Sequence, residues 1–359
     1  MAGGKNMSKK KNVALASTFL ASSVLIAGCG LFGNGSKEID PPQQENYVEN
    51  ESDLKEGEKV TTDETATENS VMTELYLIDK NGYVVPQSIA LPNSQGVAKQ
   101  ALQYLVANGP VTDLLPNGFR AVLPADTEVD VNIKDGQATV NFSKEFASYQ
   151  PEDELKILQA VTWTLTQFDS INAVKLQMNG HELKEMPVNK TPIVNEVSRA
   201  NGINIDTSSV TDITNTVALT VYYLGGESDN YYYVPVTKRI SSEEDNMVEA
   251  VVHELVKGPN NSSNLLTEFM PDLALLTEPK ITNDGKVSLN FNENIYGSFE
   301  QEIVSETLID ALVLSLTEQK DIKSVEILVN GKASLLTEDG EKLTEPVIRP
   351  EKINEGIGL

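Results

Sequence analysis

The sequence is poor in the side chains that most often carry out chemistry in proteins. Its 359 residues include one cysteine, Cys29, and two histidines, His181 and His253. A single thiol cannot form an internal disulfide, so a disulfide-stapled fold is excluded. A structural or catalytic zinc site takes three or four protein ligands, and no stretch of the sequence gathers them. We therefore expect neither a metal site nor a cofactor.

Positive charge is also scarce. Lys and Arg number 28 against 53 Asp and Glu, which gives a formal net charge of -25 at pH 7. Binding to nucleic acid depends on Lys and Arg that neutralise phosphates, and no basic stripe occurs after the first eleven residues. Nucleic acid is therefore excluded as a partner.

Residues 1–28 have the organisation of an export signal. A lysine-rich head without acids precedes the uncharged stretch NVALASTFLASSVLIAG, which is shorter than the roughly 20 apolar residues of a membrane span. The stretch ends in IAGC, which resembles a bacterial lipobox and implies cleavage between Gly28 and Cys29, with a diacylglyceryl group on the Cys29 thiol. An ordinary signal peptide with a chance cysteine is the alternative, and the true start is either Met1 or Met7.

Residues 29–71 are predicted to form a disordered acidic tether. The segment is polar, has almost no aliphatic clusters and carries many acids against three lysines, so it cannot bury enough apolar surface to fold. A flexible chain of about 40 residues reaches roughly 35 Å on average. Because its acids resist contact with an anionic bilayer, we expect the folded part to lie near the membrane but not on it.

The rest of the chain contains one unit twice. Three motifs recur in the same order: ALQYLVANGP (101–110) as AVVHELVKGP (250–259), DGQATVNF (135–142) as DGKVSLNF (284–291), and NAVKLQMNG (172–180) as KSVEILVNG (323–331). Their separation stays within 149 to 151 residues, which indicates duplication. We predict a first copy at 72–193, a linker at 194–215, a second copy at 216–347 and a C-terminal tail at 348–359.

The sequence pattern of each copy predicts the element order β(β)αββαβ. An opening strand leads into a second extended run, which Pro86 and Pro235 mark as an edge strand or a break. A helix stopped by Gly-Pro follows, and then a hairpin around Asp135-Gly136 or Asp284-Gly285, since Asp-Gly between alternating runs favours a tight hairpin turn. A second helix and a last strand complete the unit. The prediction is a two-layer α+β sandwich with its helices on one face.

No reactive motif is shared by the two copies, so we predict that the protein is not an enzyme and has no catalytic residue. His253 begins a segment like a zinc-protease helix, but Lys257 stands where the second histidine is needed. His181 is expected in a solvated loop. The acidic groups Glu152–Glu154 and Glu243–Asp245 precede helices, where the helix dipole favours negative charge.

Two further sets of residues are candidates for contacts. A tyrosine cluster in the second copy forms a candidate interaction surface: Tyr222, Tyr223, Tyr231, Tyr232 and Tyr233. Tyrosine is enriched where surfaces meet partners, although ordinary packing on a small sheet is the alternative. Asn141 and Asn290 stand before a phenylalanine at the equivalent position of the two copies. They are either ligands or, as their position favours, residues that form turns.

Together these features resemble the family of GerM-like sporulation and germination lipoproteins, which are built from two tandem GerMN domains. The residues that carry the resemblance are Cys29 in IAGC, the Gly-Pro helix stops, the two DG-x-x-x-(L/V)-N-F hairpins and the two closing strands that end in Asn-Gly. The resemblance implies domains similar to the ring-building modules of secretion systems. It also implies a role between the two forespore membranes, with indirect effects on cortex and germination. The family defines no catalytic residue.

Two functional hypotheses follow. In the first, the protein is a scaffold on the extracytoplasmic face of the cell membrane, in the outer forespore membrane. Its diacylglyceryl group anchors it, and its partners are protein components of a complex joining mother cell and forespore. In the second, it is a cell-wall module that binds or modifies spore cortex peptidoglycan, with the tyrosines or the acids as its site. No motif specifies the partner protein, the copy that contacts it or the oligomeric state.

Overall fold

The computed structural model describes residues 70–208, 210, 214–227, 230–244, 246–297, 302–333 and 335–355. The predicted signal peptide, Cys29 and almost all of the predicted tether lie outside the described residues. The first strand begins at Ser70, two residues before the boundary predicted for the first copy.

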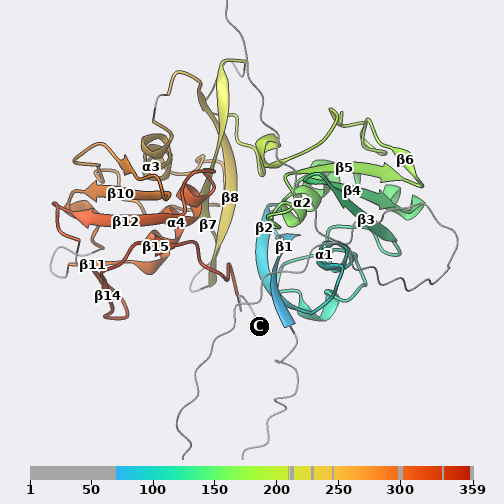
Figure 1. Cartoon of the computed structure of the whole chain (residues 1–359), viewed down its shortest axis with the longest axis horizontal. Helices are drawn as coiled ribbons and strands as arrows, with labels where there is room; N and C mark the ends of the chain where they lie inside the picture. The colour runs from blue at the N-terminus through green and yellow to red at the C-terminus, as the bar shows by residue number, and fades with distance from the viewer. Residues whose placement is uncertain are drawn as a thin grey trace, which may run out of the picture. The chain divides into compact units, whose positions relative to one another are not determined.

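The first copy, called the first domain from here on, opens with an antiparallel hairpin and continues into a four-stranded sheet (Figure 1). The hairpin consists of β1 (Ser70–Ile78) and β2 (Val84–Pro92). The sheet has the order β3-β4-β5-β6: β3 (Val129–Lys134), β4 (Gln137–Phe142), β5 (Ala173–Met178) and β6 (His181–Glu182). The helices are α1 (Val97–Gln103) and α2 (Glu154–Leu165), and short 3₁₀ turns lie at Thr112–Leu114, Lys144–Ser148 and Pro151–Asp153.

The second domain repeats this plan with a small additional sheet. Its hairpin consists of β7 (Thr216–Glu227) and β8 (Asn230–Ser241). The main sheet has the order β15-β12-β10-β9: β15 (Val347–Ile348), β12 (Ser324–Val329), β10 (Lys286–Phe291) and β9 (Lys280–Ile281). The additional sheet joins β11 (Ile303–Val304), β13 (Leu335–Thr337) and β14 (Lys342–Leu343). The helices are α3 (Met247–Lys257) and α4 (Glu306–Thr317), and 3₁₀ turns lie at Glu293–Ile295 and, between the domains, Arg199–Asn201.

Alternation along the strands explains the two layers. In β4, Ala138, Val140 and Phe142 are fully buried while the residues between them are only partly covered. The parallel pair β4 and β5 is connected through α2, as the parallel pair β10 and β12 is through α4. The buried face therefore packs on helices, and the predicted α+β fold of each copy is confirmed.

The predicted linker and tail are packed parts of the structure in their described residues. Val197 pairs with Val174 at the edge of β5, and Ile203 is fully buried. Ile353, in the predicted tail, is only 1% exposed. Each segment follows its domain and returns to the place where the domains meet.

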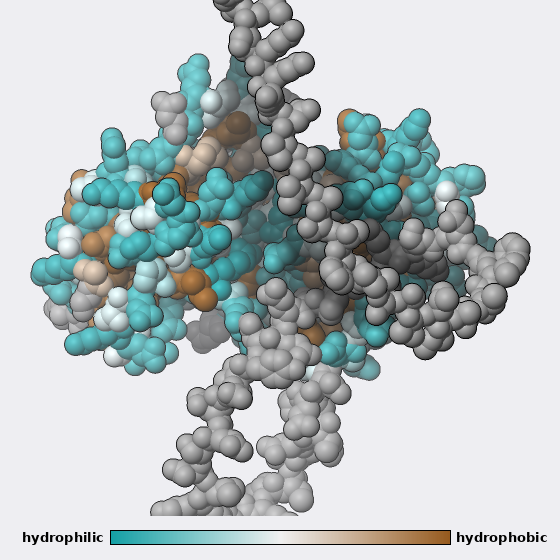
Figure 2. All heavy atoms as spheres, viewed as in Figure 1, coloured by the Kyte–Doolittle hydropathy of each residue, from teal (hydrophilic) through white to brown (hydrophobic). Residues whose placement is uncertain are grey.

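Most of the described surface in the view of Figure 2 is hydrophilic, with hydrophobic residues scattered between. Single exposed apolar side chains are normal on soluble proteins. No helix in the part of the chain that the structure describes combines the length and apolar character needed to cross a bilayer.

Candidate functional site

The two domains meet where β2 and β8 come together (Figure 1). Among the described residues, each of these strands pairs with one neighbouring strand, so both are edge strands, one of the two outcomes that Pro86 and Pro235 predicted. Val85 of β2 is fully buried within the apolar core of the second domain. The junction is thus a continuation of the core and not a loose contact.

Asn204 joins these two strands with one side chain. Its Oδ1 accepts a hydrogen bond from the N–H of Val84 at 2.9 Å. Its Nδ2 donates to the carbonyls of Val84 and Pro235, both at 2.8 Å. The backbone of Asn204 is left-handed, with φ of 46°, a conformation that asparagine adopts more readily than most residues.

Asn354 makes the same set of bonds on the other side of the junction. Its Oδ1 accepts from the N–H of Tyr233 at 2.8 Å, and its Nδ2 donates to the carbonyls of Tyr233 at 3.0 Å and Pro86 at 2.8 Å. Its φ is also left-handed, at 59°. Each asparagine therefore holds both main-chain groups of one strand and the proline carbonyl of the other, in a pseudo-two-fold arrangement.

The isoleucines before the asparagines follow the same symmetry. Ile203 donates its N–H to the Thr237 hydroxyl and accepts from the Thr237 N–H, both at 2.8 Å. Ile353 makes the corresponding bonds to Ser88, at 2.7 and 2.9 Å. The repeated motifs did not lead us to this junction. Its trace in the sequence is an Arg-x-x-x-Ile-Asn pattern that recurs at 199–204 in the predicted linker and at 349–354 in the predicted tail.

A buried carboxylate completes the junction. The Glu318 side chain, at the end of α4, is only 7% exposed. Arg199 from the predicted linker and Arg349 from the predicted tail contact it at 2.9 and 3.1 Å, and the Tyr222 hydroxyl donates to it at 2.9 Å. Burial alone would raise the pKa of Glu318, but the two guanidinium groups hold it below its usual value. Such a group stabilises the fold only while its partners are present.

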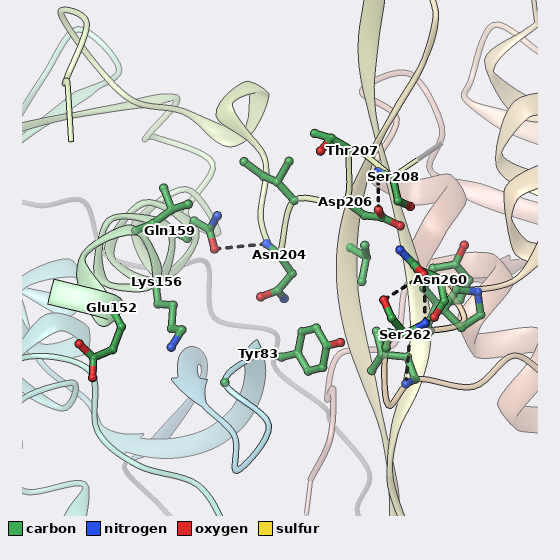
Figure 3. A pocket seen from close by; sticks show the side chains of 18 residues that line it. Tyr83, Glu152, Lys156, Gln159, Asn204, Asp206, Thr207, Ser208, Asn260 and Ser262 are labelled. Carbon is green, nitrogen blue, oxygen red and sulfur yellow. Dashed lines mark hydrogen bonds between the residues drawn. The ribbon is translucent and has the colours of Figure 1, made fainter. Parts of the chain in front are cut away.

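A groove of about 570 Å³ runs beside the junction (Figure 3). Tyr83 from the turn after β1, Lys156 and Gln159 from α2, the segment 204–208 and the loop 260–263 all line it. Its polar groups are mostly amides and hydroxyls. No cluster able to hold a metal ion occurs among the described residues. The groove is therefore suited to recognition through hydrogen bonds.

The prediction of an exposed tyrosine surface is wrong for three of its members. Tyr222, Tyr223 and Tyr232 are at most 5% exposed, because the strands that carry them face helices and the first domain. Tyr232 donates its hydroxyl to Asp79 of the first domain at 2.7 Å. Tyr233 is half-buried and donates to Asp310. Of the five, only Tyr231 is an exposed side chain, at 44%.

The acid at the start of α2 does more than face the helix dipole. Glu154 is 1% exposed and accepts hydrogen bonds from the Tyr149 hydroxyl at 2.7 Å and from the N–H groups of Val188, Asn189 and Thr191 at 2.6 to 3.1 Å. Burial opposes ionisation, but the hydrogen bonds from Thr191, Tyr149 and Asn189 lower the pKa of Glu154 to about 2. Its role is to hold the loop at 188–191.

The histidines have no partners that suggest chemistry. His181 is exposed in β6, and the His253 side chain is 73% exposed on α3. The acid beside it, Glu254, lies 3.6 Å from the His253 Nδ1 and pairs more closely with the buried Lys238 at 3.0 Å and with Lys257 at 2.9 Å. The residue that interrupts the zinc-protease pattern is thus part of a structural ion pair.

The shared asparagines form turns, as their position favoured. Asn141 accepts from the Gly180 N–H at 2.7 Å, and Asn290 accepts from the Gly331 N–H at 2.8 Å. Each side chain therefore ties a sheet strand to the turn after the next parallel strand.

Comparisons with known proteins agree with the duplicated fold. The family model for Germane, described as sporulation and spore germination, matches residues 74–184 and 220–334. A solved structure of the tandem GerMN domains of the sporulation protein GerM from Bacillus subtilis superposes with a TM-score of 0.76 at 56% identity, covering 80% of this chain and 99% of that chain. The fold is that of two GerMN domains in tandem.

The sequence relatives point the same way. The spore germination protein GerM of Bacillus subtilis (strain 168) is 52% identical over 365 residues, which cover 98% of this chain and all of that protein. The lipoprotein LpqB of Thermobifida fusca (strain YX) is 31% identical over 109 residues, 29% of this chain and 17% of that protein. The chain belongs to the Germane family of sporulation and spore germination proteins.

Proposed function

We propose that the protein is a lipid-anchored, non-enzymatic scaffold on the extracytoplasmic face of the cell membrane, where it supports a protein complex of the sporulating cell. The observation that carries the proposal is the junction: asparagines, arginines and a buried carboxylate fix two recognition domains together without forming a reactive site. Membership of a sporulation family supports the setting.

A fixed pair of domains suits a scaffold for a physical reason. Two linked surfaces raise the effective concentration of the second contact once the first has formed. A stiff junction adds a defined spacing between those contacts. In this proposal the complex spans the space between mother cell and forespore, the anchor is in the outer forespore membrane, and effects on cortex and germination are indirect.

The anchor is tested by Cys29→Ser. We expect this variant to be released from the membrane and to lose lipid labelling, because the serine hydroxyl cannot take the thioether-linked diacylglyceryl group. Ser22→Ala, in the apolar stretch but outside IAGC, is the matched control and should stay in the membrane. A Cys29→Ser protein that is still lipid-labelled would refute the lipobox interpretation.

The partner is tested by site-specific photo-cross-linking in sporulating cells. A photoreactive residue at Ser262, on the groove wall, should give adducts with membrane-complex proteins. The same residue at Thr139, on the exposed sheet face of the first domain, serves as the control. Recovery of no membrane-complex protein from any surface position would overturn the scaffold proposal.

A second candidate function is a cell-wall module that binds or modifies cortex peptidoglycan. The groove favours it, because amides, hydroxyls and aromatic side chains are groups that hydrogen-bond and stack on sugars. Purified protein would then retain or cleave cortex glycan, and Tyr83→Ala would abolish this. Retention or cleavage of the glycan would favour this function over the scaffold, which predicts neither.

A further inference from the structure

Among the described residues, the edge strand β3 of the first domain has β4 as its one strand partner, while α1 packs beside it and Lys99 of α1 reaches Asp130. Within the described residues, β3 pairs with β4 alone, in a register that places Lys134 opposite Gln137 across the turn at Asp135-Gly136. In a two-residue hairpin the pair next to the turn is hydrogen-bonded, and pairs alternate from there. Val129, Val131 and Ile133 therefore direct their N–H and C=O groups away from β4, where no described hydrogen bond reaches them.

The corresponding edge of the second domain is closed. Its strand β9 has only two residues, with Ile281 opposite Val287 and Lys280 opposite Ser288. When this register is continued by one residue, Pro279 lies opposite Leu289. The equivalent pair in the first domain is Val131 opposite Val140, so Pro279 takes the place of Val131. Proline has no N–H to offer an incoming strand, and natural sheets use it to protect edges. The duplicated unit thus has one protected edge and one that is open.

We propose that β3 is a dimerisation edge, which pairs antiparallel with β3 of a second molecule of this chain. Since both molecules use the same edge, the association closes as a two-fold dimer. The surface ion pair between Asp130 and Lys99, at 3.1 Å, lies on this strand and is exposed. Exposed pairs of this kind contribute little stability, so Asp130 can exchange its partner.

The charges on the strand fit such pairing. A register centred on Val131 places Lys134 opposite Glu128 of the second molecule, and a register centred on Asn132 places Lys134 opposite Asp130. All three charged residues are exposed. In either register two pairs of opposite charges form and no like charges face each other, which stabilises cross-strand pairing. A strand from an unrelated protein would need to supply this charge pattern, whereas a second molecule carries it already.

The test is sedimentation equilibrium of the chain from residue 29 onward, with Cys29→Ser so that no disulfide can join two molecules. We expect a reversible dimer, weaker than most specific complexes because one strand edge buries little area. Val131→Pro should weaken it at least about tenfold without disturbing the fold, since the lost N–H points outward. Circular dichroism and thermal unfolding check that the variant is folded.

Lys134→Glu tests the same edge without proline. It should also weaken the dimer at least about tenfold. A second substitution then identifies the register: in Lys134→Glu, adding Glu128→Lys restores the dimer if the register is centred on Val131, and adding Asp130→Lys restores it if the register is centred on Asn132. Lys280→Glu, on the closed edge, is the matched control and should change nothing. A chain that stays monomeric at every concentration, or a dimer that resists both β3 variants, overturns the proposal. The first outcome would leave the edge to a strand of another protein.

Discussion

The two domains hold the same hairpin by different means. In the first domain the hairpin around residues 185–192 is fastened by one side chain, Glu154, which accepts three backbone N–H groups and a tyrosine hydroxyl. In the second domain the hairpin of β13 and β14 is held by backbone pairing with β11. The serine that takes the place of Glu154, Ser305, only caps α4 and donates to Glu268.

At this hairpin the two copies share the shape but not the interactions that hold it. A carboxylate and a short strand can both fasten such a hairpin, because each supplies acceptors to backbone N–H groups, which cannot be left unpaired when buried. The two solutions differ in one respect: the carboxylate depends on pH and the strand does not. The following variants test how far the domains are equivalent.

The largest effect on stability is expected at Glu318, whose equivalent in the first domain is Gln167. Glu318→Gln removes the buried negative charge between two partly buried guanidinium groups and should cost about 3 kcal/mol of stability. Gln167→Ala, which loses hydrogen bonds to the Glu74 backbone, should cost about 1 kcal/mol. Chemical denaturation at pH 7 measures both. Equal losses would show that the charge network does not hold the domains together.

The next effect is expected at Glu154. Its folded pKa is about 2, below that of the unfolded chain, so the carboxylate stabilises the fold above the unfolded value and this contribution is lost as the pH falls toward 2. Glu154→Gln should therefore cost about 3 kcal/mol at pH 7 and much less near pH 2. Ser305→Ala should cost about 1 kcal/mol, as a lost helix cap. Urea unfolding at several pH values tests this, and a pH-independent cost for Glu154→Gln would contradict it.

The smallest effects are expected at the paired asparagines. Asn204→Ala and Asn354→Ala each remove three hydrogen bonds and should each cost about 2 kcal/mol. Because the junction is pseudo-symmetric, the stability losses of the two single variants should agree within about 0.5 kcal/mol. The loss in the double variant should differ from the sum of the two single losses, since both asparagines bind the same strands. Clearly unequal losses would show that the symmetry is geometric only.

Local patterns predicted the domains well. Alternation at Ala138, Val140 and Phe142, the Asp-Gly turns and the Gly-Pro helix stops are each set by neighbours in sequence, so they could be recognised in both copies. Repetition at one spacing then gave the duplication. The α+β fold follows from these elements, because helices and strands with one apolar face must cover each other.

The junction could not be predicted in this way. It depends on Asn204 and Asn354, whose recurring Arg-x-x-x-Ile-Asn pattern is short and whose partners are distant in sequence. Its buried charge, Glu318, belongs to a residue type that is normally exposed. The prediction of a tyrosine interaction surface failed for the same reason. Composition alone does not distinguish a surface that contacts another protein from one that contacts the other domain of the same chain.

The wide separation in sequence between the two sides of the junction has a consequence for how the chain folds. Ile353 and Ser88 are hydrogen-bonded across 265 residues, and Arg349 and Asn354 act only when that segment has arrived. Each domain has the local contacts to fold early, whereas contacts at such separation close late and slowly. A chain emerging from its amino end therefore completes the Asn204 side of the junction before the Asn354 side. A chain interrupted before residue 349 lacks Arg349, Ile353 and Asn354, and with them this second side.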